Sequence, residues 1–482
     1  MRGRTNIVAR PTPIVRGDVK SFEVEANQTV DVGDFVQIKY KSTNNVNLFE
    51  NAFQKVGIQM PGTNSMLIAY NNGDSASSPY VLGVFEWDEN LHYLRLVSSV
   101  ATNGMTNIVS MTYYNGMYVI AGRDASNQAN YAVVKVIKTG TEYKILLSNV
   151  LVVSVENDST AYQYPAYLYT ISTFACGIDN ATLCYTFMSH SYYSPSSSST
   201  DKWTYYFNHG LLTVVDNGNE QSPTITAGAN KQSNVGKSAY EESHAASDYP
   251  IDNYYNGFSK FLLLNTVDST QVTAVLTIPR QSSSATNTKQ FARRYLTIDV
   301  NGSTTSTDLL SLGNQYTYYP QKVNDNVWLD GYLDNYDLKG CLYLGSTVLQ
   351  TGVSFYSDQL VRGQAVENVV IGVDTKSSPS GVNVTLFVYD STTQKYTITS
   401  TLTINGLTSD GINGFMNLSN DTYLVLISTG YICFYYKDGV LQEGFPNLQD
   451  TVRKYAGTSK AIGFAKTGGS NGASVDIYVP TI

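Results

Sequence analysis

The feature that most constrains this fold is a short unit that recurs along most of the 482-residue chain: two apolar runs of strand length, separated by a tight turn. In residues 106–150, Asn115-Gly116 and Thr139-Gly140 separate four such runs. Asn-Gly is the strongest two-residue hairpin signal, because both central residues of the favoured turn need a positive φ. Four short strands joined in this way predict one antiparallel sheet.

The same pattern returns in other segments, and each is long enough for a sheet of up to four strands. These segments are 64–99, 166–218, 253–302, 323–345, 367–406 and 411–444. Units of this length fit radial stacking of similar sheets, which predicts a β-propeller of about six or seven blades over residues 62–446. A β-solenoid is the structural alternative, although its repeats are shorter than these units.

The composition supports an all-β protein. Charged residues make up only 15% of the chain, whereas Tyr occurs 38 times. Tyr, Thr and Val favour strands, and Ser, Asn and Gly favour turns. The formal net charge of −8 argues against a broad basic face for nucleic acid. We find no apolar segment of the length expected for a signal peptide or a membrane span. The sequence thus predicts no nucleic-acid partner and no membrane partner.

The two flanks break the repeat, and together they predict a second domain. Residues 17–61 contain short alternating strands around Gly33, and residues 447–482 end in a Gly-rich hairpin. Neither flank has enough strands for its own core. We therefore predict a small β-barrel or sandwich base formed by 17–61 and 447–482, with the propeller of 62–446 inserted. Leu448, Val452 and Tyr455 follow helical spacing, which predicts one short helix there.

The first 16 residues form a basic arm. Arg2, Arg4, Arg10 and Arg16 precede the first acid, Asp18, and two prolines favour an extended chain. A solvated terminus is one interpretation. The other is a strap that orders on an acidic neighbouring subunit.

No residue pattern identifies an active site. The four histidines lie in separate segments, which argues against zinc, and nucleotide-binding motifs are missing. Carboxylates occur in turns and loops, for example in the segment 323–340, where a solvated turn is the simplest interpretation. We interpret the cysteines as buried thiols, although Cys176 and Cys184 flank a turn and could pair. We expect no catalytic residue, no cofactor and no metal site.

Tyrosine doublets are the remaining signal. Successive side chains of a strand point to opposite faces, so one ring of each doublet packs inward and the other faces outward. The outward rings either lie at the rim of the sheet or form aromatic contacts to a glycan or a protein. The candidates for surface contacts are Tyr114, Tyr193, Tyr206, Tyr255 and Tyr319.

The flanks resemble small β-domains of tailed-phage virion proteins, especially capsid decoration and head-fibre proteins. The resemblance rests on T-V-x-x-G-D-F-V at 29–36, V-G-I at 56–58 and the closing hairpin at 462–479. It implies attachment to the major capsid protein or another virion protein, a homo-oligomer such as a trimer, and a virion location after folding in the host cytoplasm. The candidate attachment residues are Arg2, Arg4, Arg10, Arg16, Phe22, Phe35, Ile462, Phe464 and Tyr478.

The leading functional hypothesis is therefore a non-enzymatic structural protein of a phage particle. Its terminal domain would anchor it, and its propeller would project and contact host or environmental glycans. A tail-fibre or baseplate receptor-binding protein uses the same logic elsewhere on the particle. A propeller glycosidase acting on host surface polysaccharide is the alternative from another class, because two carboxylates from distant blades suffice for that chemistry.

Overall fold

Strands are the only regular secondary structure in the residues that the computed structural model describes. These residues are 17–24, 28–39, 55–71, 80–88, 93–102, 104–105, 107–124, 128–153, 168–175, 182–193, 200–218, 220–229, 231–237, 242–243, 260–267, 270–281, 289–299, 304–308, 317–324, 326–334, 337–354, 365–366, 369–377, 380–405, 412–419, 422–427, 430–437, 440–444, 451–454, 463–470 and 473–480. The chain divides into two units. One contains both chain ends, 1–44 and 444–482 together with 88–93, and the other contains 45–87 and 94–443.

Both chain ends contribute strands to one closed barrel, whose order is β1-β35-β3-β36-β38. Its strands are β1 (Gly17–Val24), β3 (Phe35–Lys39), β35 (Thr451–Lys454), β36 (Gly463–Ala465) and β38 (Ser474–Pro480). β1 and β38 run antiparallel in register from Gly17 opposite Pro480 to Glu23 opposite Ser474. A two-stranded ladder of β2 (Thr29–Val30) and β37 (Gly469–Ser470) accompanies the barrel.

The helix predicted near Val452 is wrong, because Thr451–Lys454 forms strand β35. This strand pairs in parallel with β1 and antiparallel with β3, so it has a hydrogen-bonded neighbour on each side. Thr451 and Val452 are β-branched and favour a pleated strand. Pairing on both sides outweighs a helical spacing of only three apolar residues.

Strict alternation builds the barrel core. Val24, Val36, Ala465, Val475 and Ile477 are fully buried, and Phe22 packs against this cluster from the same face of β1. Because side chains of a strand alternate between faces, the residues between these core positions lie on the outside of the barrel. The barrel therefore has a small aliphatic interior, and a different set of residues on the same strands forms its outer surface.

The other unit consists of seven sheets in the described residues, each built from consecutive strands. The first is β4 (Lys55–Gln59), β5 (Ser65–Asn71), β6 (Tyr80–Asp88) and β7 (Tyr93–Ala101), and the second is β8 (Asn107–Tyr114), β9 (Met117–Arg123), β10 (Ala129–Thr139), β11 (Glu142–Leu147) and β12 (Leu151–Val153). The third is β13 (Leu168–Ala175), β14 (Thr182–Tyr193), β15 (Thr200–Val215), β16 (Thr224–Ala227), β17 (Lys231–Lys237) and β18 (Glu242–Ser243).

The remaining four sheets have four strands each. They are β19 (Lys260–Thr266), β20 (Gln271–Gln281), β21 (Lys289–Asp299) and β22 (Thr304–Asp308); then β23 (Thr317–Asn324), β24 (Val327–Asp334), β25 (Asp337–Leu344) and β26 (Thr347–Ser354). The last two are β27 (Ala365–Val366), β28 (Val369–Ser377), β29 (Ser380–Asp390) and β30 (Lys395–Asn405), and β31 (Ile412–Ser419), β32 (Thr422–Ile427), β33 (Tyr431–Lys437) and β34 (Val440–Glu443).

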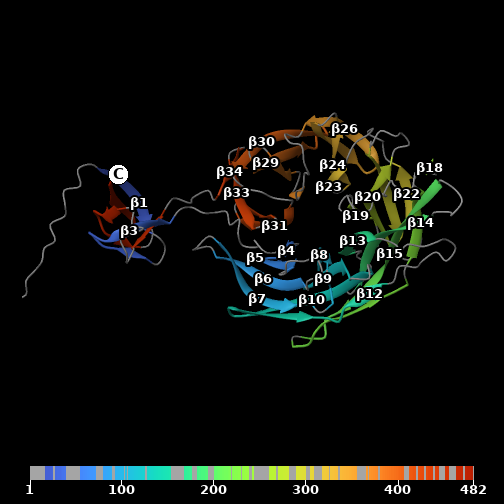
Figure 1. Cartoon of the computed structure of the whole chain (residues 1–482), viewed down its shortest axis with the longest axis horizontal. Coiled ribbons are helices and arrows are strands. Elements are labelled where there is room, and N and C mark those ends of the chain that lie inside the picture. The colour runs from blue at the N-terminus through green and yellow to red at the C-terminus, as the bar shows by residue number, and fades with distance from the viewer. Residues whose placement is uncertain are drawn as a thin grey trace, which may run out of the picture. The chain divides into compact units, whose positions relative to one another are not determined.

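These sheets are the blades of a β-propeller, arranged in a ring from β4 to β34 (Figure 1). The all-β, propeller-like fold predicted from the sequence is confirmed. The predicted boundary at residue 61 differs, because β4 pairs with β5 inside the first blade. The hairpin signal at Asn115-Gly116 is also confirmed, since their φ values are 47° and 79°.

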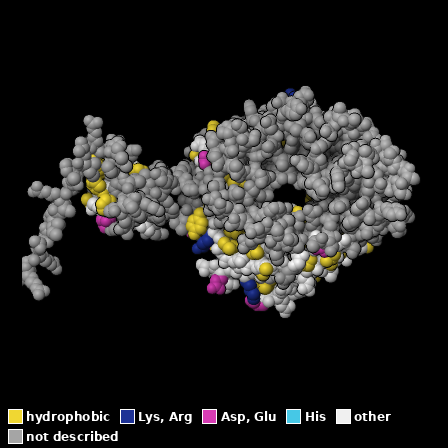
Figure 2. Space-filling model, in the orientation of Figure 1, with side chains coloured by type: hydrophobic (Ala, Val, Ile, Leu, Met, Phe, Trp, Pro, Cys, Tyr) yellow, Lys and Arg dark blue, Asp and Glu magenta, His cyan; other side chains and the backbone are white. Residues whose placement is uncertain are grey.

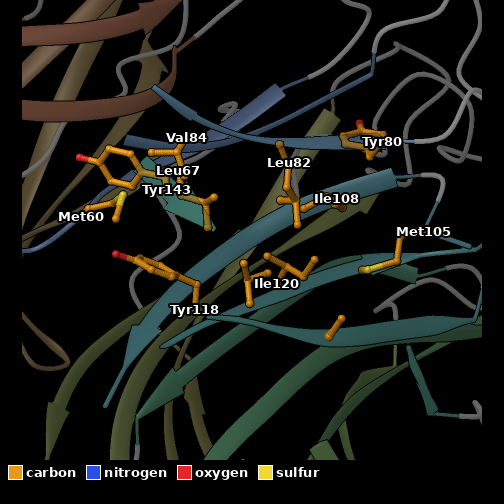
Figure 3. Close-up of a cluster of buried hydrophobic side chains, with 13 residues drawn as sticks. Met60, Leu67, Tyr80, Leu82, Val84, Met105, Ile108, Tyr118, Ile120 and Tyr143 are labelled. Atoms are coloured by element: carbon orange, nitrogen blue, oxygen red, sulfur yellow. The ribbon is translucent and has the colours of Figure 1, made fainter. Parts of the chain in front are cut away.

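Apolar side chains fill the spaces between successive blades. Figure 3 shows the cluster between the first two blades, where Leu67, Leu82 and Val84 of one sheet face Ile108 and Ile120 of the next. The opposite face of the second blade packs Tyr131 and Val133 against Leu212 and Val214 of the third. A middle strand such as β10 is therefore apolar on both faces, which explains runs such as Tyr131–Val134 that do not alternate.

The first and last blades meet without sharing a strand. The side-chain amide of Gln59 donates to the carbonyl oxygen of Asn417 at 2.8 Å, and its oxygen accepts from the Asn417 N–H at 3.0 Å. The backbones approach closely here, since a Cβ on Gly414 would lie 2.9 Å from the carbonyl oxygen of Gly57. Further out, the Tyr431 hydroxyl accepts from the Leu94 N–H at 3.1 Å. We call this junction the closing seam.

Gln59→Ala should loosen the closing seam, because it removes both hydrogen bonds to Asn417. We expect a loss of about 1–2 kcal/mol in unfolding free energy, and faster amide exchange confined to β4 and β31. The matched control is Gln350→Ala, since Gln350 makes a similar bond to the Tyr396 N–H at 2.8 Å between consecutive blades. Equal exchange changes at β31 in both variants would contradict a specific role for Gln59 in ring closure.

Candidate functional site

Four apolar side chains form a row across the outside of the barrel. Val19 of β1 lies opposite Tyr478 of β38, Tyr478 lies opposite Phe464 of β36, and Phe464 lies opposite Phe35 of β3. Residues directly opposite each other in a sheet share a face. Since Val36, Ala465 and Ile477 point inward, these four neighbours point outward. We call Val19, Tyr478, Phe464 and Phe35 the apolar row.

The apolar row is accessible at both ends. Val19 and Phe35 are each 47% exposed, and the two rings between them are half-buried. The rings of Phe464 and Tyr478 lie 5.3 Å apart with an interplanar angle of 31°. Figure 2 shows hydrophobic side chains gathered on the visible face of the barrel. Aromatic residues of this kind are enriched at protein interfaces, because they supply large contact area with few rotatable bonds.

Polar groups border the apolar row. Ser21 donates to a carboxylate oxygen of Asp476 at 2.6 Å, in the next outward position along β1 and β38. Beside Phe35, the carboxylate of Asp34 accepts from the Asp31 N–H at 2.9 Å and stabilises the turn that leads into β3. The tight turn needs Gly33, whose φ is 90°. The row is thus a narrow apolar band that crosses four of the five barrel strands and has polar groups beside it, as interface centres have.

The structure brings together three of the predicted attachment residues: Phe35, Phe464 and Tyr478. Phe22 instead packs toward the barrel core, because it shares the inward face of β1 with Val24. Ile462 and the four arginines of the arm lie outside the described residues. The sequence analysis missed Val19. The alternation of GDVKSFEV could have identified it, since Val19 falls on the face opposite Phe22 and Val24.

The surface tyrosine prediction is wrong for Tyr114. Its side chain is 9% exposed and packs in the cluster between the second and third blades, whereas Tyr113 is 40% exposed. Tyr113 instead lies against Tyr118, with ring centroids 5.3 Å apart. The two rings do lie on opposite faces of the strand, but the buried ring is that of Tyr114. Tyr255 lies outside the described residues, and the structure describes only the backbone of Tyr193, Tyr206 and Tyr319.

Glu86 anchors a charged cluster between the first two blades. It accepts hydrogen bonds from Lys138 at 2.9 Å, from the Tyr143 hydroxyl at 2.9 Å and from Arg95 at 3.3 Å. The hydrogen bond from Lys138 is the main reason that the pKa of Glu86 lies below its ordinary value. The bonds to Tyr143 and Glu86 raise the pKa of Lys138. These groups join blades rather than leaving a carboxylate available for chemistry.

Two further ion pairs link the second and third blades. The ammonium of Lys135, a mostly buried residue, binds both carboxylate oxygens of Asp216 at 2.7 and 2.8 Å and the carbonyl oxygen of Gly218 at 3.0 Å. Lys144 pairs with Glu220 nearby. The lysine contact and the Gly218 N–H lower the pKa of Asp216. Both ion pairs therefore serve as contacts between sheets.

Within the described part of the acidic segment, Asp330 lies apart from Asp334 and Asp337, which pair with each other at the end of their hairpin. Asp330 is fully buried on β24, and Asp334 lies four residues further along the same strand, about 13 Å away at the rise of a strand. In the part of the chain that the structure describes, no three His, Cys, Asp or Glu side chains are placed to hold a metal ion. Cys341 and Cys433 are buried thiols outside any disulfide, as predicted, whereas Cys176 lies outside the described residues.

Comparisons with known proteins give a fold and little more. No family model and no curated protein matches the chain. Among solved structures, the β-propeller domain of the Trilobed protease from Pyrococcus furiosus is 11% identical and covers 83% of this chain and 99% of its own, with a TM-score of 0.39. An α-L-arabinanase from Penicillium chrysogenum is 8% identical and covers 75% and 98%, with a TM-score of 0.37. At these values neither likeness carries an inference about activity.

Within the described residues, no helix is long and apolar enough to cross a bilayer.

The Glu86 cluster predicts a pH-dependent stability. Because the pKa of Glu86 is lowered in the folded protein, its contribution is present above its unfolded pKa of about 4.3 and is lost as the pH falls through the folded value. The difference in unfolding free energy between the wild type and Glu86→Gln should therefore be largest near pH 7 and shrink below about pH 4. Denaturant titrations across this range measure it.

The control for this prediction is Glu142→Gln, at an exposed position of neighbouring β11. Its difference from the wild type should stay smaller throughout. A Glu86→Gln difference that is constant from pH 7 to pH 3 would show that the ionised carboxylate does not stabilise the junction.

Proposed function

We propose that this chain is a structural protein of a tailed-phage particle, of the capsid decoration or head-fibre type. In this proposal the terminal barrel anchors the chain to a major capsid protein or another virion protein, and the propeller is the displayed module. The observation that carries the proposal is the apolar row, because an exposed aromatic strip on a small barrel suits a surface that another protein covers.

The topology supports a division of labour between the units. β1 and β3 come from one chain end and β35, β36 and β38 from the other, so the whole propeller is one insertion between β3 and β35. Because all five barrel strands lie outside the insertion, the barrel is a complete unit that does not need any strand of the propeller. The resemblance of these flanks to virion β-domains is the basis for naming a phage particle as the site of attachment.

The blade topology supports a display role. Successive strands of a blade are antiparallel, so the first-to-second and third-to-fourth hairpins lie on one face of the ring. The chain enters β4 and leaves β34 on the other face. The hairpin face carries exposed apolar side chains, among them Val267, Leu344 and Val440, whose exposures lie between 41% and 55%. We propose that this face contacts host or environmental glycans.

Ile477→Asp tests the anchoring role. Ile477 is fully buried in the barrel core, and an unpaired buried charge costs several kcal/mol, which a barrel of this size cannot absorb. We expect particles assembled with this variant to lack the protein in gel or mass-spectrometric analysis. The propeller should remain folded, as its own thermal transition would show.

The matched control is Val32→Asp, which introduces the same charge at a position of the barrel that is 70% exposed and lies outside the apolar row. It should be incorporated at the wild-type level. Normal incorporation of Ile477→Asp would overturn the anchoring role of the barrel. Incorporation confined to tails would place the protein among receptor-binding proteins, and sugar release from host envelopes by the purified chain would favour a glycosidase.

A further inference from the structure

The closing seam joins the two blades that lie furthest apart in the sequence. In the described residues every blade consists of consecutive strands, so the first blade, β4 to β7, and the last, β31 to β34, share no strand. All other neighbouring blades follow each other directly along the chain. The seam therefore depends on noncovalent contacts and on whatever keeps its two blades close together.

The contacts across the seam are specific, but they need both blades in place. Gln59 exchanges two hydrogen bonds with the backbone of Asn417. The buried rings of Trp87 and Tyr431 meet edge to face, with centroids 6.0 Å apart, and the Tyr431 hydroxyl accepts from the Leu94 N–H at 3.1 Å. If the seam opens, the first and last blades become terminal repeats that each lack one neighbour.

The barrel fixes the chain on both sides of the propeller. Lys39, the last residue of β3, lies directly opposite Thr451, the first residue of β35, in an antiparallel ladder. The Cα atoms of such opposite residues lie about 5 Å apart. The chain leaves the barrel strands at Lys39 and returns to them at Thr451. Only residues 40–54 and 444–450 separate this pair from the propeller strands β4 and β34.

We infer that the barrel is a clasp for the propeller ring, which no shared strand closes. Because one strand pair holds both ends of the inserted chain, it raises the effective concentration of the first blade for the last. A folded barrel therefore favours the closed seam, and separation of the barrel strands lets the seam open. The single blades do not need the clasp, since each pairs its own consecutive strands.

This coupling has a consequence for any partner of the barrel. A partner that binds and stabilises the folded barrel also favours the closed ring, because the two equilibria are linked. An attached chain would then carry a more firmly closed propeller than a free one. The clasp itself does not rest on the proposed attachment, because it acts within one chain in solution.

Amide hydrogen exchange of the full-length chain, read by mass spectrometry with residue-level fragmentation, tests the clasp. The N–H groups of Leu94 and Asn417 report on the seam, because each donates to a side chain of the opposite blade. In Ile477→Asp, whose barrel core carries a buried charge, both should exchange at least about tenfold faster than in the wild type. The Tyr396 N–H, which donates to Gln350 between consecutive blades, should keep its wild-type rate.

Val32→Asp is the matched control, since it places the same charge at a position that is 70% exposed. Both seam amides should stay protected in this variant. Adding Lys39→Cys and Thr451→Cys to Ile477→Asp provides a rescue, because a disulfide between these opposite positions keeps the two ends of the ring together without a folded barrel. Oxidation should return both seam amides toward the wild-type rate, and reduction should reverse the rescue.

A second measurement serves if Ile477→Asp does not accumulate. A specific protease site placed within residues 40–54 and cut after folding severs one of the two connections between clasp and ring, and the seam amides should again exchange faster than in the uncut chain. Wild-type exchange at both amides, in Ile477→Asp or after the cut, would overturn the inference. Faster exchange in Ile477→Asp that the disulfide does not slow would also overturn it, because the barrel would then act other than by holding the two ends.

These outcomes are distinguishable from those of the attachment experiment. A chain that never enters particles but shows the barrel-dependent seam would refute the proposed function and leave the clasp standing. Barrel-dependent incorporation of a chain whose seam amides ignore the barrel would do the reverse.

Discussion

The pairing of the two chain ends is the constraint on which the barrel and its outer surface depend. β1 and β38 lie side by side over seven residue pairs, although more than 400 residues separate them in the sequence. Loop-closure entropy opposes this pairing, although its cost grows only with the logarithm of the loop length. The barrel offsets it with a fully buried aliphatic core and strands paired on both sides. The same pairing sets the outer register, and so it aligns Val19 with Tyr478 in the apolar row.

The propeller, in contrast, is built from pairings that are local in the sequence. Each blade consists of consecutive strands, so its hydrogen bonds form between near neighbours in sequence. Blade stacking then needs only apolar faces, together with polar contacts at the junctions such as the Lys135–Asp216 ion pair. The closing seam is the exception, because it joins the first and last blades through Gln59 and a glycine contact rather than through a shared strand.

The sequence predicted what depends on local patterns. Turn residues such as Asn115-Gly116 identified the hairpins, and the count of repeated units bounded the number of blades. The prediction failed where distant contacts outweigh local spacing. Val452 lies on a strand because β1 and β3 pair on either side of it, and Tyr114 turns inward because the third blade covers it. Phe35, Phe464 and Tyr478 were chosen as candidates, but only the register across three strands shows that they adjoin Val19.

We propose that the barrel holds this chain on a particle while the propeller is displayed. The most direct measurement is immunogold electron microscopy of purified particles, with separate antibodies against the propeller and against the barrel. The account predicts dense label over the head with the propeller antibody. It predicts little label with the barrel antibody, because the particle covers the surface of the barrel. Particles free of label with both antibodies would contradict it.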